Sequence, residues 1–221
     1  MKLSGITHII FDLDGTLLDT FDDICLSVNY ALEHTGFQRK SHEAIRAKIG
    51  HGAVHIIEAV THCDDEERVA HTLRLFRRHY LEHPITHTRP YPGVSHTLDI
   101  LHSRNMLMSV ISNKPHNIVM AIIERLHMNS YFNAIIGGQN GYALKPDPSM
   151  PRAVMKAAVS TPQESLIVGD QDTDVNAARN AETHFIGVTY GFSSREQMVS
   201  SGAELLIDFF PQLLDYLDPS E

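Results

Sequence analysis

The sequence predicts an α/β fold, a doubly wound parallel sheet into which an all-helical domain is inserted. Two observations lead to this fold class. Short apolar runs rich in β-branched residues alternate with amphipathic stretches of helical period over the second half of the chain. Before them, a long interval between the first two apolar runs contains helical patterns and almost no strand pattern.

Five apolar runs that end in polar residues or glycine are expected to be strands. Because the runs are continuous, they are typical of strands that are buried on both faces. The runs are Thr7–Asp12, Met106–Ser112, Asn133–Gly138, Ser165–Asp170 and His184–Thr189. Helical periods separate the last four runs, which indicates a parallel sheet. These helices are expected at Asn117–Leu126, Pro151–Val159 and Thr173–Ala181.

Roughly a hundred residues separate the first two expected strands, whereas a crossover needs only a dozen or so beyond its helix. The helical patterns in this interval are Phe21–His34, Ala53–His62 and Asp64–Leu81. Turn signals lie between them at Thr35–Gly36 and Gly50–Gly52, and Pro84 and the turn Pro90–Gly93 follow the last helix. We therefore expect a helical domain over residues 21–83 and an α/β core made of residues 1–20 and 84–221.

Composition and charge exclude several classes of function. The 221 residues, of which 43% are hydrophobic and 20% charged, are typical of a globular protein of one or two domains. Eighteen Lys and Arg against 27 Asp and Glu give a net charge of −9 without a basic block, which disfavours nucleic-acid partners. Cys25 and Cys63 show no CxxC spacing, so neither a disulfide framework nor a thiolate zinc site is expected.

Export and membrane anchoring are not indicated either. The N-terminal apolar run is too short for a signal peptide, and no apolar stretch approaches the ~18 residues of a membrane span. We expect a cytoplasmic monomer or homodimer without a membrane partner.

Reactive side chains follow four of the expected strands. In open parallel sheets the ligand binds beyond the carboxyl ends of the strands. The run Asp12–Thr16 (DLDGT) ends the first strand, Ser112–Asn113 ends the second, Lys145 follows the third after a loop, and Asp170 ends the fourth, with Asp174 close behind. A single strand-end Asp is more often a cap or turn residue. Carboxylates, a hydroxyl and a Lys at successive strand ends together predict a functional site.

These residues resemble the motifs of the haloacid dehalogenase superfamily of phosphatases. Asp12–Thr16 matches the DxDGT motif, Ser112 the hydroxyl of the second motif, Lys145 the cation of the third, and Gly169–Asp170 with Asp174 the GDxxxD motif. The order and spacing of the motifs and the helical insertion match over essentially the whole chain. The resemblance implies a Rossmann-like core with an inserted helical cap domain.

Within this superfamily the chain is most similar to the phosphoglycolate phosphatase branch. The segments that carry this similarity are FDLDGTLLDT (Phe11–Thr20), IGHGA (Ile49–Ala53), YPGV (Tyr91–Val94) and KPDP (Lys145–Pro148). The chain departs from the branch at Gln171, where many relatives carry Ser or Thr, and at Met150, near which relatives often have a further Pro.

The resemblance implies a phosphatase that works through an aspartyl phosphate. Asp12 is the expected nucleophile, because a carboxylate can attack phosphorus and divide a difficult hydrolysis into two steps. Asp14, two residues further on, is expected to protonate the departing alcohol and later to deprotonate water.

Two carboxylates that face a dianionic phosphate require positive charge. Mg²⁺ is the expected cofactor, held by the Asp12 and Asp170 carboxylates and, by resemblance, the Asp14 backbone carbonyl. Lys145 is the second expected cation. Asp174 is expected to orient Lys145 or a water beside the metal, and Asp172 is an alternative for that role. The expected substrate-binding residues of the core are Thr16, Ser112, Asn113 and Lys145.

In the helical insertion, Gly50, His51 and Gly52 are expected to bind substrate at the start of a helix, because a helix N-terminus attracts anions. The alternative is a glycine-rich turn that only connects two helices. His79, His83 and His87 recur at a spacing of four, but Pro84 interrupts this face, so a structural metal is not expected.

The expected substrate is a small phosphorylated metabolite, and the branch resemblance points to conversion of 2-phosphoglycolate to glycolate and phosphate. The alternatives are a phosphatase for a sugar phosphate, a nucleotide or pyrophosphate, and a β-phosphoglucomutase-like phosphomutase. A dehalogenase is disfavoured because halide leaves without protonation and gives Asp14 no evident task. A signalling receiver domain is usually smaller and lacks a helical insertion.

Overall fold

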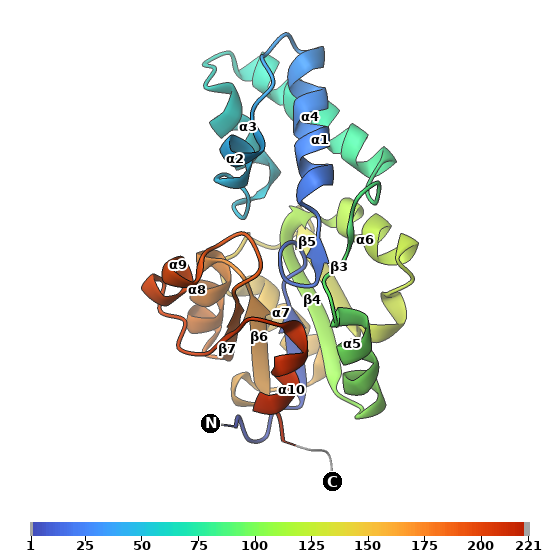
Figure 1. Ribbon diagram of the computed structural model, residues 1–221, viewed down its shortest axis with the longest axis vertical. Coiled ribbons are helices and arrows are strands. Elements are labelled where there is room, and N and C mark those ends of the chain that lie inside the picture. Colours follow the sequence, from blue (N-terminus) through green and yellow to red (C-terminus); the bar gives the residue numbers. More distant parts are fainter. Residues whose placement is uncertain (1, 219–221) are drawn as a thin grey trace.

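The computed structural model describes residues 2–218. Within them, a parallel six-stranded sheet lies between helices on both faces, and further helices stand beyond one end of the sheet (Figure 1). The strands, in spatial order, are β5 (Ala134–Gly138), β4 (Leu107–Pro115), β1 (His8–Phe11), β6 (Ser165–Gly169), β7 (His184–Val188) and β8 (Leu206–Ile207). The doubly wound α/β fold expected from the sequence is confirmed.

Strand β1 is buried on both faces of the sheet and pairs in parallel with β4 and β6. Ile9 and Phe11 belong to the apolar cluster under α5 and α6, whereas Ile10 belongs to the cluster under α7 and α8. This two-sided burial explains the continuous apolar run in the sequence. It also places the carboxyl end of β1, where Asp12 follows, at the middle of the sheet edge.

The helices around the sheet alternate with the strands along the chain. They are α5 (Val94–Ser103), α6 (His116–Arg125), α7 (Ser149–Ala158), α8 (Asp172–Ala181), α9 (Arg195–Ser200) and α10 (Leu213–Tyr216). Short 3-10 turns are η1 (Asn129–Tyr131), η2 (Pro162–Glu164) and η3 (Phe210–Gln212). Three of the helices agree with the expected ranges to within one or two residues. Helix α5 was not expected, although its buried residues Val94, Leu98 and Leu101 follow a helical period.

One strand boundary differs from the expected one in a way that matters for the site. The sequence pattern places the end of the second strand at Ser112, but β4 continues to Pro115 and its pairing with β5 shifts between Ser112 and Pro115. The three extra residues stay extended and buried beside Gly137 and Gly138. Lys114 is therefore carried on the strand itself, beyond the expected boundary.

Four inserted helices lie between β1 and β4 in the chain and stand above the carboxyl ends of the strands (Figure 1). They are α1 (Phe21–His34), α2 (His42–Arg46), α3 (Gly52–Thr61) and α4 (Glu66–Glu82). The long helices α1 and α4 pack against each other. Helix α4 begins later than the expected residue 64, because the Asp65 carboxylate accepts a hydrogen bond from the Arg68 backbone N–H and caps the helix.

Two short strands connect the inserted helices to the core. Strand β2 (Leu18–Asp19) pairs antiparallel with β3 (Arg89–Pro90), so that Leu18 lies opposite Pro90 and Asp19 opposite Arg89. The chain thus leaves and re-enters the core at adjacent points.

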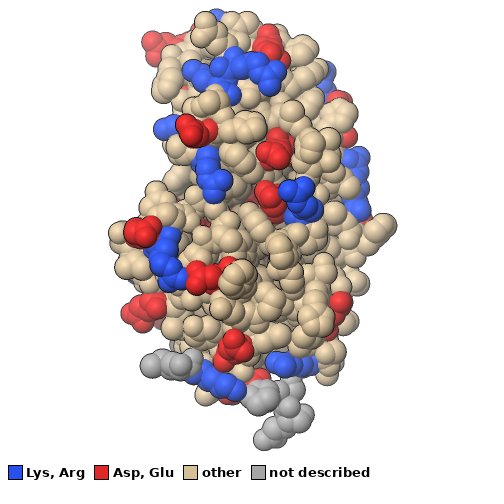
Figure 2. Space-filling view, in the orientation of Figure 1, with Lys and Arg blue, Asp and Glu red and all other residues tan. Residues whose placement is uncertain are grey.

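Charged side chains of both signs are interspersed on the face shown in Figure 2, and uncharged or histidine residues (tan) occupy most of its central area. This face carries no continuous basic tract of the kind that follows a nucleic-acid backbone.

Candidate active site

Asp12 and Lys145 form a buried ion pair at the carboxyl ends of β1 and β4. The Lys145 ammonium donates to Asp12 Oδ1 at 2.5 Å, to Asp174 Oδ1 at 2.6 Å and to the Ile111 carbonyl at 3.3 Å. An ammonium has three donors, so these contacts fix its position completely. Two carboxylates together raise the pKa of Lys145 above its ordinary value, although burial by itself lowers it. Lys145 is therefore a permanent cation beside Asp12.

Asp170 lies beside this pair at the end of β6 and is fully buried. Its oxygens accept hydrogen bonds from Thr16 Oγ1 at 3.2 Å and from the Phe192 backbone N–H at 2.7 Å. Asp174, in the first turn of α8, uses Oδ2 to accept the backbone N–H groups of Asp170 and Gln171. Asp174 thus orients both Lys145 and the end of β6.

The Asp12, Asp170 and Asp174 carboxylates form one cluster, in which one oxygen of each lies within 4.8 Å of the others. Burial, and then the neighbouring carboxylates, raise the pKa of Asp12 to about 7 and hold the pKa of Asp170 well above its usual range, although Lys145 opposes both shifts. Three carboxylates share one ammonium, so their full ionisation requires a further cation beside them. Hard carboxylate oxygens with uncompensated charge fit a divalent cation such as Mg²⁺.

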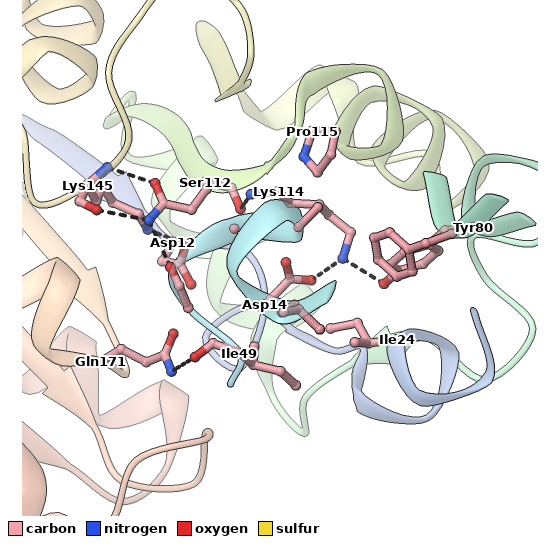
Figure 3. A pocket seen from close by; sticks show the side chains of 16 residues that line it. Asp12, Asp14, Ile24, Ile49, Tyr80, Ser112, Lys114, Pro115, Lys145 and Gln171 are labelled. Carbon is pink, nitrogen blue, oxygen red and sulfur yellow. Dashed lines mark hydrogen bonds and ion pairs between the residues drawn. The ribbon is translucent and has the colours of Figure 1, made fainter. Parts of the chain in front are cut away.

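Asp14 lies near this cluster but pairs with a different cation. The Lys114 ammonium donates to Asp14 Oδ1 at 2.7 Å and to the Tyr80 hydroxyl at 2.6 Å, and it lies 4.2 Å from the centre of the Tyr80 ring (Figure 3). Burial lowers the pKa of Lys114, and Asp14 opposes that shift. Tyr80 comes from α4, so an inserted helix contacts the core directly beside Asp14.

Ser112 and Asn113 follow Ile111 on β4 and line the same cavity. The Ser112 hydroxyl accepts the Lys114 backbone N–H at 3.2 Å. The Asn113 side-chain amide donates to the Gly50 carbonyl at 2.8 Å and to the Lys145 carbonyl at 3.0 Å, and its oxygen accepts the Lys145 backbone N–H at 2.7 Å. The Asn113 side chain therefore joins the Lys145 loop to the inserted helices.

The cavity between the core and the inserted helices has a volume of about 40 Å³. We call its two sides the core wall and the helical wall. The core wall includes Asp12, Asp14, Ser112, Asn113, Lys114 and Lys145. The helical wall includes Ile24, Ile49, Ile56, Phe76 and Tyr80. Figure 3 shows the charged groups of the core wall on one side and Ile24, Ile49 and Tyr80 on the other.

The three residues of the expected glycine turn lie in different places: two line the cavity and one lies at the surface. Gly50 and Gly52 line the cavity, and a Cβ atom at Gly50, whose φ is +116°, would collide with the Gln171 side chain. His51 is exposed and its ring lies against His55, 5.0 Å between centres, so it does not line the cavity. The structure therefore does not place His51 with the other expected substrate-binding residues, because the start of α3 turns its side chain toward solvent.

Thr16 and Asp172 also lie away from the cavity. Thr16 is fully buried and donates to Asp170, so it orients a carboxylate rather than facing the cavity. Of the two candidates for orienting Lys145, only Asp174 contacts it. Both residues lie in the first turn of α8, but the Asp174 side chain is the one that lies over Gly169, toward the end of β6.

Three polar residues of the cavity were not expected as site residues: Lys114, Tyr80 and Gln171. Gln171 donates from Nε2 to the Ile49 carbonyl at 2.9 Å and so joins α8 to the inserted helices. Lys114 directly follows Ser112 and Asn113. Had the expected strand been extended by three residues, Lys114 would have been predicted at the same edge of the sheet. The sequence contains no comparable signal for Tyr80, which lies on the apolar face of a helix.

Comparisons with known proteins agree with this geometry. A family model described as haloacid dehalogenase-like hydrolase matches residues 9–188. A phosphoglycolate phosphatase of Aquifex aeolicus is 34% identical over 184 residues, which is 83% of this chain and 85% of that protein. One of Pseudomonas putida is 35% identical over 213 residues, covering 93% of this chain and 78% of that protein.

Solved structures show the same fold. The crystal structure of a predicted phosphoglycolate phosphatase from Haemophilus somnus has a TM-score of 0.91 and 28% identity, and the match covers 96% of this chain and 98% of that one. The chain belongs to the haloacid dehalogenase-like hydrolases. Within that family its relatives place it with the phosphoric monoester hydrolases, so the resemblance noted in the sequence is confirmed. No helix among residues 2–218 is both long and apolar enough to cross a membrane.

Proposed function

We propose that this enzyme is a Mg²⁺-dependent phosphatase that hydrolyses a small phosphate monoester, 2-phosphoglycolate, through an aspartyl phosphate on Asp12. One observation carries the proposal. Asp12 lines the cavity, where Lys145 holds its Oδ1, and the buried Asp170 carboxylate lies beside it in the same cluster, ready to share a cation with Asp12. A nucleophile, a fixed cation and a metal-binding cluster thus meet at one point.

In the first step, an oxygen of Asp12 attacks phosphorus, and the bond from phosphorus to the alcohol oxygen breaks. Asp14 enters this step as the carboxylic acid and gives its proton to that oxygen as it leaves. In the second step, Asp14 removes a proton from water, and the water oxygen attacks phosphorus. The bond between phosphorus and Asp12 breaks, which releases phosphate and restores both carboxyl groups to their initial states.

Electrostatic stabilisation comes from groups that are already fixed. Lys145 holds its charge next to Asp12, and the Ser112 hydroxyl and the backbone N–H of Asn113 line the cavity as donors for phosphoryl oxygens. Mg²⁺ held by the Asp12 and Asp170 carboxylates and the Asp14 backbone carbonyl would neutralise the negative charge that gathers during transfer. Asp174 keeps its oxygens for Lys145 and the backbone, which makes it a supporting residue.

Residues 21–83 serve as a cap over this site. A cavity of about 40 Å³ has room for about three water molecules, which is less than a phosphate monoester needs. Substrate entry therefore requires α1–α4 to move away from the core, and their return excludes water from the reacting groups. The paired strands β2 and β3 are the hinge.

The assignment of 2-phosphoglycolate is supported by the names of the relatives and by the apolar side chains that face the cavity from the inserted helices. The test is hydrolysis of a panel that contains 2-phosphoglycolate, a sugar phosphate, a nucleoside monophosphate and pyrophosphate. We expect the highest kcat/KM for 2-phosphoglycolate, complete loss of activity in excess chelator and poor replacement of Mg²⁺ by Ca²⁺, whose coordination is larger and less rigid.

Two results would contradict the proposal. Undiminished activity in chelator would exclude the metal-dependent mechanism. A higher kcat/KM for the sugar phosphate, or its conversion into an isomeric phosphate, would replace the assigned substrate or indicate a phosphomutase.

A further inference from the structure

Lys114 is a buried cation that the proposed mechanism does not use. It lines the cavity from β4, and its side chain is only 4% exposed. Of its three donors, Asp14 and Tyr80 accept two, and among residues 2–218 no acceptor is found for the third. Because burying an ammonium is costly, such a residue is expected to have a specific partner during the reaction.

The position of Lys114 relates it to the leaving group of the substrate. Its ammonium lies 2.7 Å from Oδ1 of Asp14, the carboxylate that is to protonate the leaving oxygen. It therefore lies next to the alcohol half of the ester, on the far side of Asp14 from Asp12. In 2-phosphoglycolate the carboxylate is attached to the carbon next to the ester oxygen, so it falls within reach of the Lys114 ammonium.

The rest of the surroundings disfavours larger polar alcohols. Ile24, Ile49, Ile56 and Phe76 face the cavity from the inserted helices, and these side chains offer no hydrogen bonds. A sugar that carried several hydroxyl groups into this space would leave them without partners, which costs binding free energy. A short alcohol with one negative charge fits one ammonium that faces apolar side chains of the inserted helices.

We propose that Lys114 is the specificity-determining residue of this enzyme: it binds the carboxylate of a short anionic leaving group, and Tyr80 positions it. This inference rests on the proposed phosphatase function and deepens it. Tyr80 acts from the inserted helix α4, so its contact with Lys114 forms only when that helix lies against the core. Lys114 therefore couples binding of the substrate carboxylate to closure of the inserted helices.

The test compares three substrates. 2-Phosphoglycolate has an anionic, poor leaving group; ethyl phosphate has a neutral, poor leaving group; p-nitrophenyl phosphate has a neutral, good one. For Lys114→Met we expect kcat/KM for 2-phosphoglycolate to fall roughly 100-fold, against less than fivefold for ethyl phosphate. Lys114→Gln, whose amide can still donate to Asp14, should show the same selective loss. Tyr80→Phe, which removes only the hydroxyl, should raise KM for 2-phosphoglycolate several-fold.

Lys156→Met is the matched control, because it removes the same charge from an exposed position on α7. It should leave all three substrates unchanged, and thermal unfolding of every variant separates lost recognition from lost folding. Should Lys114→Met fail to fold, Lys114→Gln and Tyr80→Phe still decide the question.

Two patterns would overturn the inference while leaving the phosphatase function intact. Equal losses for 2-phosphoglycolate and ethyl phosphate, with p-nitrophenyl phosphate spared, would mean that Lys114 only orients Asp14. An unchanged preference for 2-phosphoglycolate in the variants would place the carboxylate elsewhere. If the wild-type enzyme itself shows no preference for 2-phosphoglycolate over ethyl phosphate, the assigned substrate and this inference both fall.

Discussion

The core wall of the cavity carries charged groups that hydrogen-bond one another, whereas the helical wall carries mainly apolar side chains and meets the core through few polar contacts. Lys145, for example, uses all three donors within the core. Around the cavity, three hydrogen bonds join the core to the inserted helices. Asn113 and Gln171 donate to the backbone carbonyls of Gly50 and Ile49, and Lys114 donates to the Tyr80 hydroxyl. The hydrogen bonds of the core wall hold the catalytic groups in fixed positions. The few contacts of the helical wall allow the inserted helices to move away from the core, and its side chains can select the substrate.

The largest effect is expected from Asp12→Asn. The amide has nearly the same shape but is neither a nucleophile nor an anionic ligand, so kcat should fall by at least about 10⁴-fold. Thermal unfolding should show an intact fold, because Asp174 still pairs with Lys145. Turnover within tenfold of wild type would show that Asp12 is not the nucleophile.

Asp14→Asn should have a smaller effect that depends on the substrate. General acid catalysis is worth about 10²–10⁴-fold, and this should be lost for alkyl phosphates. For p-nitrophenyl phosphate, whose leaving group needs no proton, we expect less than a tenfold loss. The ratio of the two rates is the measurement, and equal losses would assign Asp14 a purely structural task.

A third prediction concerns stability at the opposite end of β1, where His8 is fully buried between Ser109 and Ser160. Burial lowers the pKa of His8 to about 4 from 6.5. Between these values the unfolded chain binds the proton and the folded chain does not, so this contribution to stability is complete above pH 6.5 and is lost as the pH falls toward 4.

From pH 7.5 to pH 5, His8 should lower the free energy of unfolding by about 2 kcal/mol. Urea unfolding of wild type and His8→Gln at the two pH values separates the contribution of His8 to the free energy of unfolding from that of the other titrating groups. The difference between the two proteins should shrink at pH 5. A difference that is the same at both pH values would mean that His8 does not titrate in this way.

The smallest effects are expected where the core meets the start of α3. Gln171→Ala removes the hydrogen bond to the Ile49 carbonyl and should raise KM several-fold for 2-phosphoglycolate and p-nitrophenyl phosphate alike, because closure is weakened for both. His51→Ala, at the exposed neighbouring turn, should change KM by less than twofold. A larger change at His51 than at Gln171 would restore the role that the sequence pattern suggested for His51.

The core could be predicted from the sequence in considerable detail, because its strands are continuous apolar runs with reactive residues at their carboxyl ends. Asp12 and Asp170 end different runs and Lys145 follows a third after a loop, yet parallel pairing brings them to one edge. The relation of Asp174 to Lys145 was one of two open alternatives, since the sequence spacing alone does not show which side chain faces inward.

The helical wall was much harder to predict. A helical period indicates that Phe76 and Tyr80 face an apolar interior, but it does not show which strand lies beneath them. The five-residue helix α2 is too short for a periodic signal. His51 illustrates the same difficulty, because a turn at the start of a helix can direct a side chain either way.

The antiparallel pair of β2 and β3 also has a consequence for folding. Strand β1 must pair with β4 across a long stretch of chain, which is a slow search when the intervening segment is unstructured. Once the inserted helices form and Asp19 meets Arg89, the effective loop between the two strands contracts to residues 12–18 on one side and 90–106 on the other. By the same reasoning, a tight turn that joined Asp19 directly to Arg89 would turn the pair into a β-hairpin and leave every pairing of the main sheet in register. The length of the insertion is therefore free to vary without any change in the topology of the core.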